Sequence, residues 1–142
     1  MKRRPWTVMR VPSRARALVA VSAGGVLGAE ARYLLGAAFP AEPGAWPWTT
    51  FWINITGCLL IGVLYTVLSE LATDPHPLLR PSLGVGVLGG YTTFSTWSVE
   101  TVQLVDRGSY GTALGYAVVS PVTAVLACAL AVALTRRIGG AA

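Results

Sequence analysis

Four long apolar segments constrain the fold of this chain more than any other feature of its sequence. They cover residues 17–39, 48–68, 78–105 and 110–134, and each is long enough for a membrane helix, which needs about 20 apolar residues. The short breaks between them are rich in proline, glycine and aspartate, which mark turns and leave no room for a soluble domain. We therefore predict an all-α membrane protein with four transmembrane helices in one domain, over residues 17–135.

The scarcity of charge excludes most other classes of protein. Of the 142 residues, 54% are hydrophobic and 12% are charged, against about 25% charged residues in a soluble domain. The two cysteines, Cys58 and Cys128, lie in different apolar segments without a CxxC pattern, so we expect small buried side chains without a metal or redox role. His76, the one histidine, stands between two prolines in a turn, and no nucleophile–base pair or metal-ligand spacing is visible. We therefore expect no enzyme activity.

The basic residues lie mainly on one side of the predicted membrane. Four spans place both termini on the same side, together with the loop between the second and third spans. That side carries nine lysines and arginines, whereas the opposite side carries Arg107 alone, if Arg32 inside the first span is left out. Such a bias predicts cytoplasmic termini in the cell membrane, with a basic tail over residues 1–16 and a short tail over 136–142. The nine basic residues are Lys2, Arg3, Arg4, Arg10, Arg14, Arg16, Arg80, Arg136 and Arg137.

The N-terminal segment also has features of a secretory signal peptide, namely a basic start, an apolar run and an A-x-A pattern at residues 29–31. Apolar sequence resumes at once, at residues 33–39, whereas the mature sequence after a cleavage site is polar. We therefore interpret the first segment as an uncleaved membrane helix.

Polar side chains form stripes at helical spacing on three of the predicted spans. Such groups are costly in a membrane and usually mark function, although serine and threonine also bond back to their own helix or fill gaps between helices. Three aligned stripes favour the walls of a narrow polar path. The hydroxyl and amide donors, without an Asp or His relay, suit an anion or a neutral solute better than protons. The stripes are Thr50 and Asn54, then Thr93, Thr96 and Glu100, and finally Thr112, Tyr116, Ser120 and Thr123.

Two aromatic residues, Phe94 and Trp97, lie beside the stripe of the third span. Because ring edges are electropositive, these side chains could present them to an anion. The alternative interpretation is ordinary packing between helices.

The third span is a poor candidate for an uninterrupted helix. Residues 84–90 contain four glycines, and five hydroxyl residues follow within residues 92–98. A glycine pair costs a helix about 2 kcal/mol relative to alanine, and we predict a break at Gly89–Gly90. In a membrane such a break is tolerated only where it is buried in protein or lines a cavity. The alternative is a glycine-rich packing face, and Gly86 and Gly90 fit its small-xxx-small spacing.

Residues 89–97 read Gly-Gly-Tyr-Thr-Thr-Phe-Ser-Thr-Trp, which resembles the third-helix motif G-G-x-T-T-F-S-T-F of the Fluc-type fluoride channels, also called CrcB proteins. Residues 24–33 are similar to the first-helix motif G-G-x-x-G-A-x-x-R-Y of that family, and residues 50–57 resemble its second-helix motif T-x-x-V-N-x-x-G. Tyr116 and Ser120 fall where the family has a tyrosine and a serine four residues apart. The resemblance extends over about residues 20–135, in the right order.

The resemblance implies a membrane channel that exports fluoride passively and so lowers cytoplasmic fluoride. It implies an antiparallel dimer of four-helix subunits, two fluoride pores, and a central Na⁺ held by the backbone carbonyls of Gly89 and Thr92. Arg32 would lie near the aqueous entrance and attract the anion. The other pore residues implied by the motifs are Asn54 as an amide donor, Phe94 and Trp97 as an aromatic box, and Thr93, Thr96, Glu100, Tyr116 and Ser120 as a polar track.

Two features depart from the family pattern. The second aromatic of the box is Trp97 instead of phenylalanine, and its larger ring could narrow one pore. In addition, an antiparallel homodimer needs a chain that inserts both ways, whereas the basic residues here are divided nine to one. We therefore expect this chain to insert mainly one way and to pair with an oppositely oriented homologue.

Two alternatives stay open at this point. Small multidrug or guanidinium exporters also have four short helices, with an essential glutamate in the first, and Glu30 lies in the first span here. That interpretation predicts proton-coupled export and gives no role to the glycine–threonine segment. A non-transporting subunit of a membrane assembly would explain the small residues but not the polar stripes.

Overall fold

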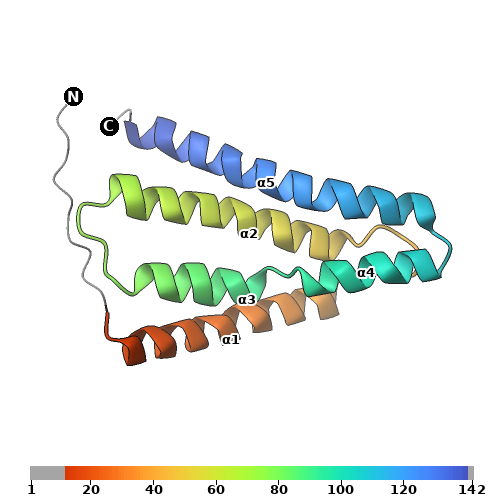
Figure 1. The fold of residues 1–142 in the computed structure, drawn as a ribbon, viewed down its shortest axis with the longest axis horizontal. Coiled ribbons are helices and arrows are strands. Elements are labelled where there is room, and N and C mark those ends of the chain that lie inside the picture. Colours follow the sequence, from red (N-terminus) through yellow and green to blue (C-terminus); the bar gives the residue numbers. More distant parts are fainter. Residues whose placement is uncertain (1–11, 141–142) are drawn as a thin grey trace.

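The computed structural model describes residues 12–140, and every regular element in this range is a helix. The helices run up and down the long axis of the molecule (Figure 1). The all-α class predicted from the sequence is thus confirmed for the described residues. In chain order the elements are α1 (Arg14–Ala38), α2 (Trp48–Thr66), the π-helical η1 (Val67–Leu71) and η2 (Arg80–Leu88), α3 (Gly89–Tyr91), α4 (Ser95–Asp106) and α5 (Tyr110–Gly140).

Three stretches within the described residues are long and apolar enough to cross a membrane, namely α1, α2 with η1, and α5. The third predicted span is divided into two shorter pieces, η2–α3 and α4, which follow one another along the same direction (Figure 1). This division is the main departure from a simple bundle of four continuous helices.

The terminal helices extend beyond the predicted spans. α1 begins at Arg14, inside the predicted basic tail, and α5 continues through Gly140, so residues 136–140 prolong the last helix. Residues 1–11 and 141–142 lie outside the described residues, and with them Lys2, Arg3, Arg4 and Arg10 of the predicted tail.

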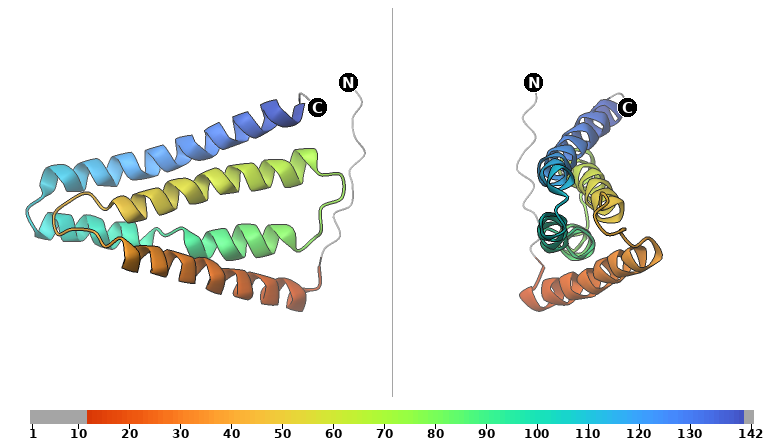
Figure 2. Two further views of the ribbon diagram at one scale, coloured as in Figure 1. Left: turned by 180° about the vertical axis from the view of Figure 1, so that it is seen from behind. Right: turned by 90° about the vertical axis from the view of Figure 1, so that its right-hand side faces the viewer.

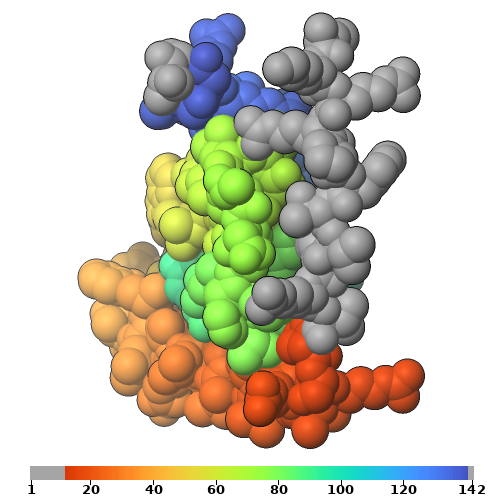
Figure 3. Space-filling model, turned by 90° about the vertical axis from the view of Figure 1, so that its left-hand side faces the viewer, coloured from red at the N-terminus to blue at the C-terminus, as the bar shows by residue number. Residues whose placement is uncertain are grey.

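One end of the molecule collects the start of α1, the loop between η1 and η2, and the end of α5 (Figures 1 and 2). Figure 3 shows this end face. The predicted grouping of the second loop with both outer helix ends is therefore confirmed for the described residues. The basic residues of these segments are Arg14, Arg16, Arg80, Arg136 and Arg137.

Glycines allow α1 to lie very close to the third segment. Gly24 and Gly28 are the buried residues of α1, and a Cβ on Gly28 would collide with the carbonyl oxygen of Val87. On the facing side, a Cβ on Gly90 would collide with the carbonyl oxygen of Gly25. The interpretation of Gly86 and Gly90 as a packing face is therefore confirmed, because neither helix could approach the other so closely with side chains at these positions.

The break in the third segment lies slightly later than the glycine pair at which it was predicted. Gly89 and Gly90 are helical, and the backbone becomes extended at Thr92, with φ −75° and ψ 158°. The helix resumes at Ser95. The prediction of a break was right, but its position at Gly89–Gly90 was wrong, because Gly90 serves the contact with α1.

The core lies on the other side of the third segment, where α2 and α4 pack against α5. Its buried members are Phe51, Leu104, Ala113 and Tyr116. By contrast, the outer faces are apolar and exposed, and Val26, Leu114 and Val125 are each between 68% and 70% exposed. Exposed apolar surface on this scale is typical of helices that face lipid or partner helices.

Candidate functional site

The amide of Asn54 holds the break in the third segment. Its Nδ2 donates to the carbonyl oxygen of Thr93 at 3.0 Å, and its Oδ1 accepts from the backbone N–H of Thr93 at 2.9 Å. α2 thus supplies both hydrogen-bonding partners that Thr93 lacks because it is not part of a helix. An asparagine suits this position, since it carries a donor and an acceptor side by side.

Around the break, backbone N–H groups donate to side-chain oxygens instead of to the backbone carbonyls that they would bond in a continuous helix. In an α-helix, the N–H of Thr93 would bond the Gly89 carbonyl, but here it bonds Asn54. Likewise, the N–H of Thr96 would bond the Thr92 carbonyl, but here it donates to Oγ1 of Thr93 at 3.0 Å. The carbonyls of Gly89 and Thr92 have therefore both lost their helical donors.

The Gly90 carbonyl receives a replacement donor from α1. Nε of Arg32 donates to it at 3.1 Å, across 58 residues of sequence. Of the carbonyls freed by the break, this one is consequently occupied by a side chain.

Hydroxyl groups organise the start of α4. Oγ1 of Thr93 accepts from the N–H of Thr96 and donates to Oγ1 of Thr96, in both cases at 3.0 Å. The Ser95 hydroxyl lies 3.3 Å from the same Thr93 oxygen. Thr93 therefore caps the first turn of α4, a role in which a threonine satisfies N–H groups that have no partner within the helix.

The carboxylate of Glu100 joins three helices. The hydroxyl of Thr50 on α2 donates to Oε1, and the hydroxyl of Tyr116 on α5 donates to Oε2, each at 2.7 Å. Tyr116 is completely buried, and Ser120 on the next turn of α5 is 2% exposed. One residue from each of the three predicted polar stripes thus belongs to this network. Thr50 was assigned to a stripe from its spacing, but its contact with Glu100 requires the register of two helices.

A cavity of about 380 Å³ adjoins this network. Its walls include residues from α1, α2 and the third segment, and they combine one basic side chain, one acidic side chain and several hydroxyls. Arg32 is therefore placed at a polar cavity, together with part of the predicted track. The predicted or stripe residues in its lining are Arg32, Thr50, Thr93, Thr96 and Glu100.

The aromatic pair lies at the same break but outside this cavity. The ring centroids of Phe94 and Trp97 are 4.9 Å apart, with the planes inclined by 43°. Phe94 is 76% exposed, whereas Trp97 is partly buried against the core and its indole N–H donates to the Tyr116 carbonyl at 3.3 Å. The two rings are consequently held very differently, which their spacing in the sequence does not reveal.

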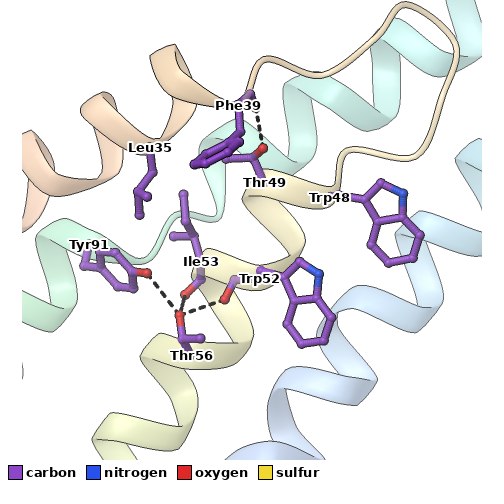
Figure 4. A pocket seen from close by; sticks show the side chains of 8 residues that line it. All are labelled: Leu35, Phe39, Trp48, Thr49, Trp52, Ile53, Thr56 and Tyr91. Carbon is purple, nitrogen blue, oxygen red and sulfur yellow. Dashed lines mark hydrogen bonds between the residues drawn. The ribbon is translucent and has the colours of Figure 1, made fainter.

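A second cavity of about 360 Å³ lies between α1, α2 and α3 and is mostly apolar (Figure 4). None of its lining residues was predicted as part of a site, and two of them contact each other through their hydroxyl groups. The hydroxyls of Thr56 and Tyr91 approach each other to 3.0 Å (Figure 4). Tyr91 occupies the variable position of the third-helix motif, so the motif gave no signal for this contact.

Glu30, the glutamate on which the exporter alternative depends, is exposed on α1. It does not line either of the two cavities described above. Within the described residues, no cluster of three or more His, Cys, Asp or Glu side chains exists that could hold a metal ion.

Comparison with known proteins gives a consistent set of relatives. Residues 19–132 match the model of a family described as CrcB-like protein, Camphor Resistance (CrcB). A Streptomyces avermitilis protein named "Fluoride-specific ion channel FluC 2" is 42% identical over 120 residues, which cover 79% of this chain and 75% of the relative. A Nocardia farcinica protein of the same name is 46% identical over 125 residues, or 88% of this chain and 89% of the relative. A second Streptomyces avermitilis protein, "Fluoride-specific ion channel FluC 3", is 46% identical over 96 residues, or 68% of this chain and 47% of the relative.

Proposed function

The chain belongs to the CrcB family, and from this premise we propose that it is a fluoride-selective channel that lets fluoride leave the cytoplasm passively. It is a multi-pass membrane protein and not an enzyme. The observation that carries the proposal is the break at residues 92–94, where side chains from α1 and α2 replace the backbone hydrogen bonds of the third segment. Such a break is stable in a membrane only inside protein or beside a cavity, and a polar cavity adjoins it here.

The groups around the break suit a small, strongly hydrated anion. A selective pore must replace the water around fluoride by hydrogen-bond donors and still bind the ion weakly enough to release it. The hydroxyl of Thr96, which accepts from Thr93, and the second N–H of the Asn54 amide are such donors, and the exposed ring of Phe94 offers an electropositive edge. Arg32 supplies positive charge at the cavity. In this account fluoride moves from the cavity along the start of α4 towards Phe94.

Glu100, Tyr116 and Ser120 belong to the same route in this proposal. The carboxylate of Glu100 is bonded by the hydroxyls of Thr50 and Tyr116, so it orients these donors between α2, α4 and α5. Trp97 completes the aromatic pair, and its hydrogen bond to α5 restricts the rotation of its ring.

The same proposal includes a structural Na⁺ at the carbonyls of Gly89 and Thr92. The donor set fits, because these are the two carbonyls whose helical N–H partners are bonded instead to Asn54 and to the Thr93 hydroxyl. Oxygen atoms of this kind are the ligands that hard cations prefer. A bound Na⁺ would offset the dipoles of the carbonyls, while Asn54 and Arg32 hold the backbone around them.

We further propose an antiparallel dimer in which this chain pairs with an oppositely oriented homologue. The support comes from the concentration of basic residues at one end of the molecule, which favours a single orientation with both termini in the cytoplasm. The exposed Phe94 and the apolar outer faces leave surface for a partner. Two of the relatives, FluC 2 and FluC 3, come from one organism, which supports the presence of paired homologues.

Fluoride efflux from proteoliposomes that contain this chain together with an oppositely oriented homologue tests the proposed function, and the efflux of every variant below is measured with the same partner. We expect fluoride release, measured with an electrode, that runs down its gradient without any pH gradient, while chloride stays inside. Efflux that requires a pH gradient, or export of a guanidinium cation, would instead support the exporter alternative. The matched control is the Asn54→Asp variant, which keeps the fold of α2 but removes the amide donor.

The dimer proposal needs a separate comparison. The chain is expressed alone and together with a homologue from the same genome whose loops carry the opposite charge bias. We expect efflux only after coexpression. A stable, conducting homodimer of this chain alone would contradict the heterodimer and leave the channel function intact.

A further inference from the structure

In the proposed channel Arg32 attracts the anion, but the hydrogen bond from Arg32 to the backbone at the break indicates a second, structural role. Gly24, Gly28 and Arg32 are spaced four residues apart, so they form one stripe on α1. The two glycines of this stripe bring α1 against η2 and α3. The third position places the Nε of Arg32 at the carbonyl of Gly90.

The Gly90 carbonyl needs an external donor because of the break itself. In a continuous helix it would accept from the N–H of Phe94, but the backbone turns to an extended conformation at Thr92. A partly buried carbonyl without a partner is unfavourable, and the hydrogen bond from a charged donor removes that penalty. Among the described residues no carboxylate lies within ion-pair distance of Arg32, so an acidic partner does not compete for this contact.

We propose that Arg32 is a positioning residue that fixes the end of α3, and with it the backbone of Thr92 and Thr93, by donating from Nε to the Gly90 carbonyl. This inference rests on the proposed channel function for its activity readout and adds a role that does not depend on attraction of the anion by charge. The guanidinium has four further N–H donors besides the one on Nε, so the same side chain can still face the polar cavity. Arg32 and Asn54 thus hold the break from two different helices.

The two roles of Arg32 predict opposite results for two substitutions. Glutamine carries its side-chain nitrogen the same number of bonds from Cα as the Nε of arginine, but it has no charge. Lysine keeps the charge but places its nitrogen one bond further along and leaves an apolar methylene at the position of Nε. Arg32→Gln therefore preserves the donor without the charge, and Arg32→Lys preserves the charge without the donor.

We expect Arg32→Gln to slow fluoride efflux less than Arg32→Lys and Arg32→Ala do, and we expect these two variants to lose about tenfold or more, as for the loss of one hydrogen bond from a charged donor. The measurement is the initial rate of efflux from proteoliposomes, at low and at high ionic strength. A purely electrostatic role predicts the reverse order, with a deficit of Arg32→Gln that grows as the ionic strength falls. Normal efflux by Arg32→Lys together with impaired efflux by Arg32→Gln would overturn the proposal.

A second measurement does not need channel activity, so it separates failure of this inference from failure of the proposed function. Replacing Tyr91 by its α-hydroxy acid converts the bond after Gly90 to an ester, whose carbonyl is a weaker acceptor. In a double-mutant cycle with Arg32→Ala, we expect the ester to lower the melting temperature less in the variant than in the unmodified chain. An equal effect of the ester in both backgrounds would contradict the contact. A cooperative unfolding transition and an unchanged helix content of the Arg32→Ala variant serve as the folding control.

Discussion

The two halves of the third apolar segment are held in the bundle by contacts of different kinds. The first half, η2 with α3, is fixed by close approach of backbone to backbone, which the glycines of both partners permit. The second half, from Thr92 into α4, is fixed by side-chain hydrogen bonds to Asn54, Thr50 and Tyr116. The first half is therefore specified mainly by the absence of side chains, with hydrogen bonds from Arg32 and Thr56 only at its end, and the second half is specified by hydrogen-bonding side chains.

Because of this difference, one half of the segment is held rigidly by close packing, and the other half carries the polar side chains of the proposed site. Dispersion contacts between close backbones hold the first half without exposing polar groups. The second half leaves the helical hydrogen-bond pattern at residues 92–94, and in the proposed channel its side chains provide donors to the solute. The first half can thus act as the fixed support on which the proposed site is built.

The largest effect is expected for Gly28→Ala, which acts on the glycine contact. The new Cβ would collide with the carbonyl of Val87, part of a backbone that cannot move aside locally. We expect a loss of roughly 3 kcal/mol of stability, at the upper end for overpacked positions, measured by thermal unfolding in detergent.

The matched control is Gly25→Ala, three residues away on the same helix. Its Cβ would lie 4.0 Å from its nearest neighbour, the Gly86 carbonyl, which is an ordinary contact. Equal stability of the Gly25 and Gly28 variants would show that backbone proximity does not hold the first half.

The next largest effect is expected for Asn54→Asp, which acts on the second half. The carboxylate still accepts from the Thr93 N–H but faces the Thr93 carbonyl without a donor. We expect fluoride efflux to fall at least about tenfold, since a hydrogen bond is replaced by repulsion. Gln103→Glu, which changes the only other side-chain amide of the chain and lies exposed on α4, is the control. If both variants conduct normally, the break does not depend on Asn54.

A smaller effect is expected for Tyr116→Phe, which removes one of the two hydroxyl donors of Glu100. Because the carboxylate keeps Thr50 as a partner, we expect about 1–2 kcal/mol of lost stability and a severalfold slower efflux. Tyr110→Phe is the control on the same helix, since Tyr110 is 68% exposed. An unchanged Tyr116→Phe channel would mean that the carboxylate does not organise these helices.

The smallest effect is expected outside both halves, at the ion pair of Glu70 and Arg136. Arg136 donates to both carboxylate oxygens of Glu70, with the shortest distance at 2.6 Å, but the side chains are 41% and 59% exposed. We expect Glu70→Gln to lower the melting temperature only slightly, an effect that salt abolishes, and to leave efflux unchanged. A larger loss that persists in high salt would assign this pair a role in the fold.

The sequence was sufficient for the all-α class, the apolar spans and the presence of a break, because hydrophobic length and glycine content are local properties. The position of the break could not be derived locally, since Gly90 looks like a helix breaker but is required for contact with α1. Similarly, Arg32 donates a hydrogen bond to the Gly90 carbonyl, and Thr50 and Tyr116 donate to Glu100. These hydrogen bonds depend on how the helices are aligned with one another. Such partners are separated by up to 58 residues and leave no trace in periodicity.

The central claim is that the hydroxyl-rich stretch after the break lines the route of the halide. Cysteines placed singly at Thr93, Thr96, Val99 and Val102, in a chain with Cys58 and Cys128 replaced by alanine, test it through modification by a charged, water-soluble thiol reagent. Val99 and Val102 are 54% and 58% exposed on the outer face of α4, so they serve as the lipid-facing controls. We predict modification at residues 93 and 96 that fluoride slows, and none at 99 and 102. Modification confined to 99 and 102, or equal rates at all four positions with and without fluoride, would contradict the account.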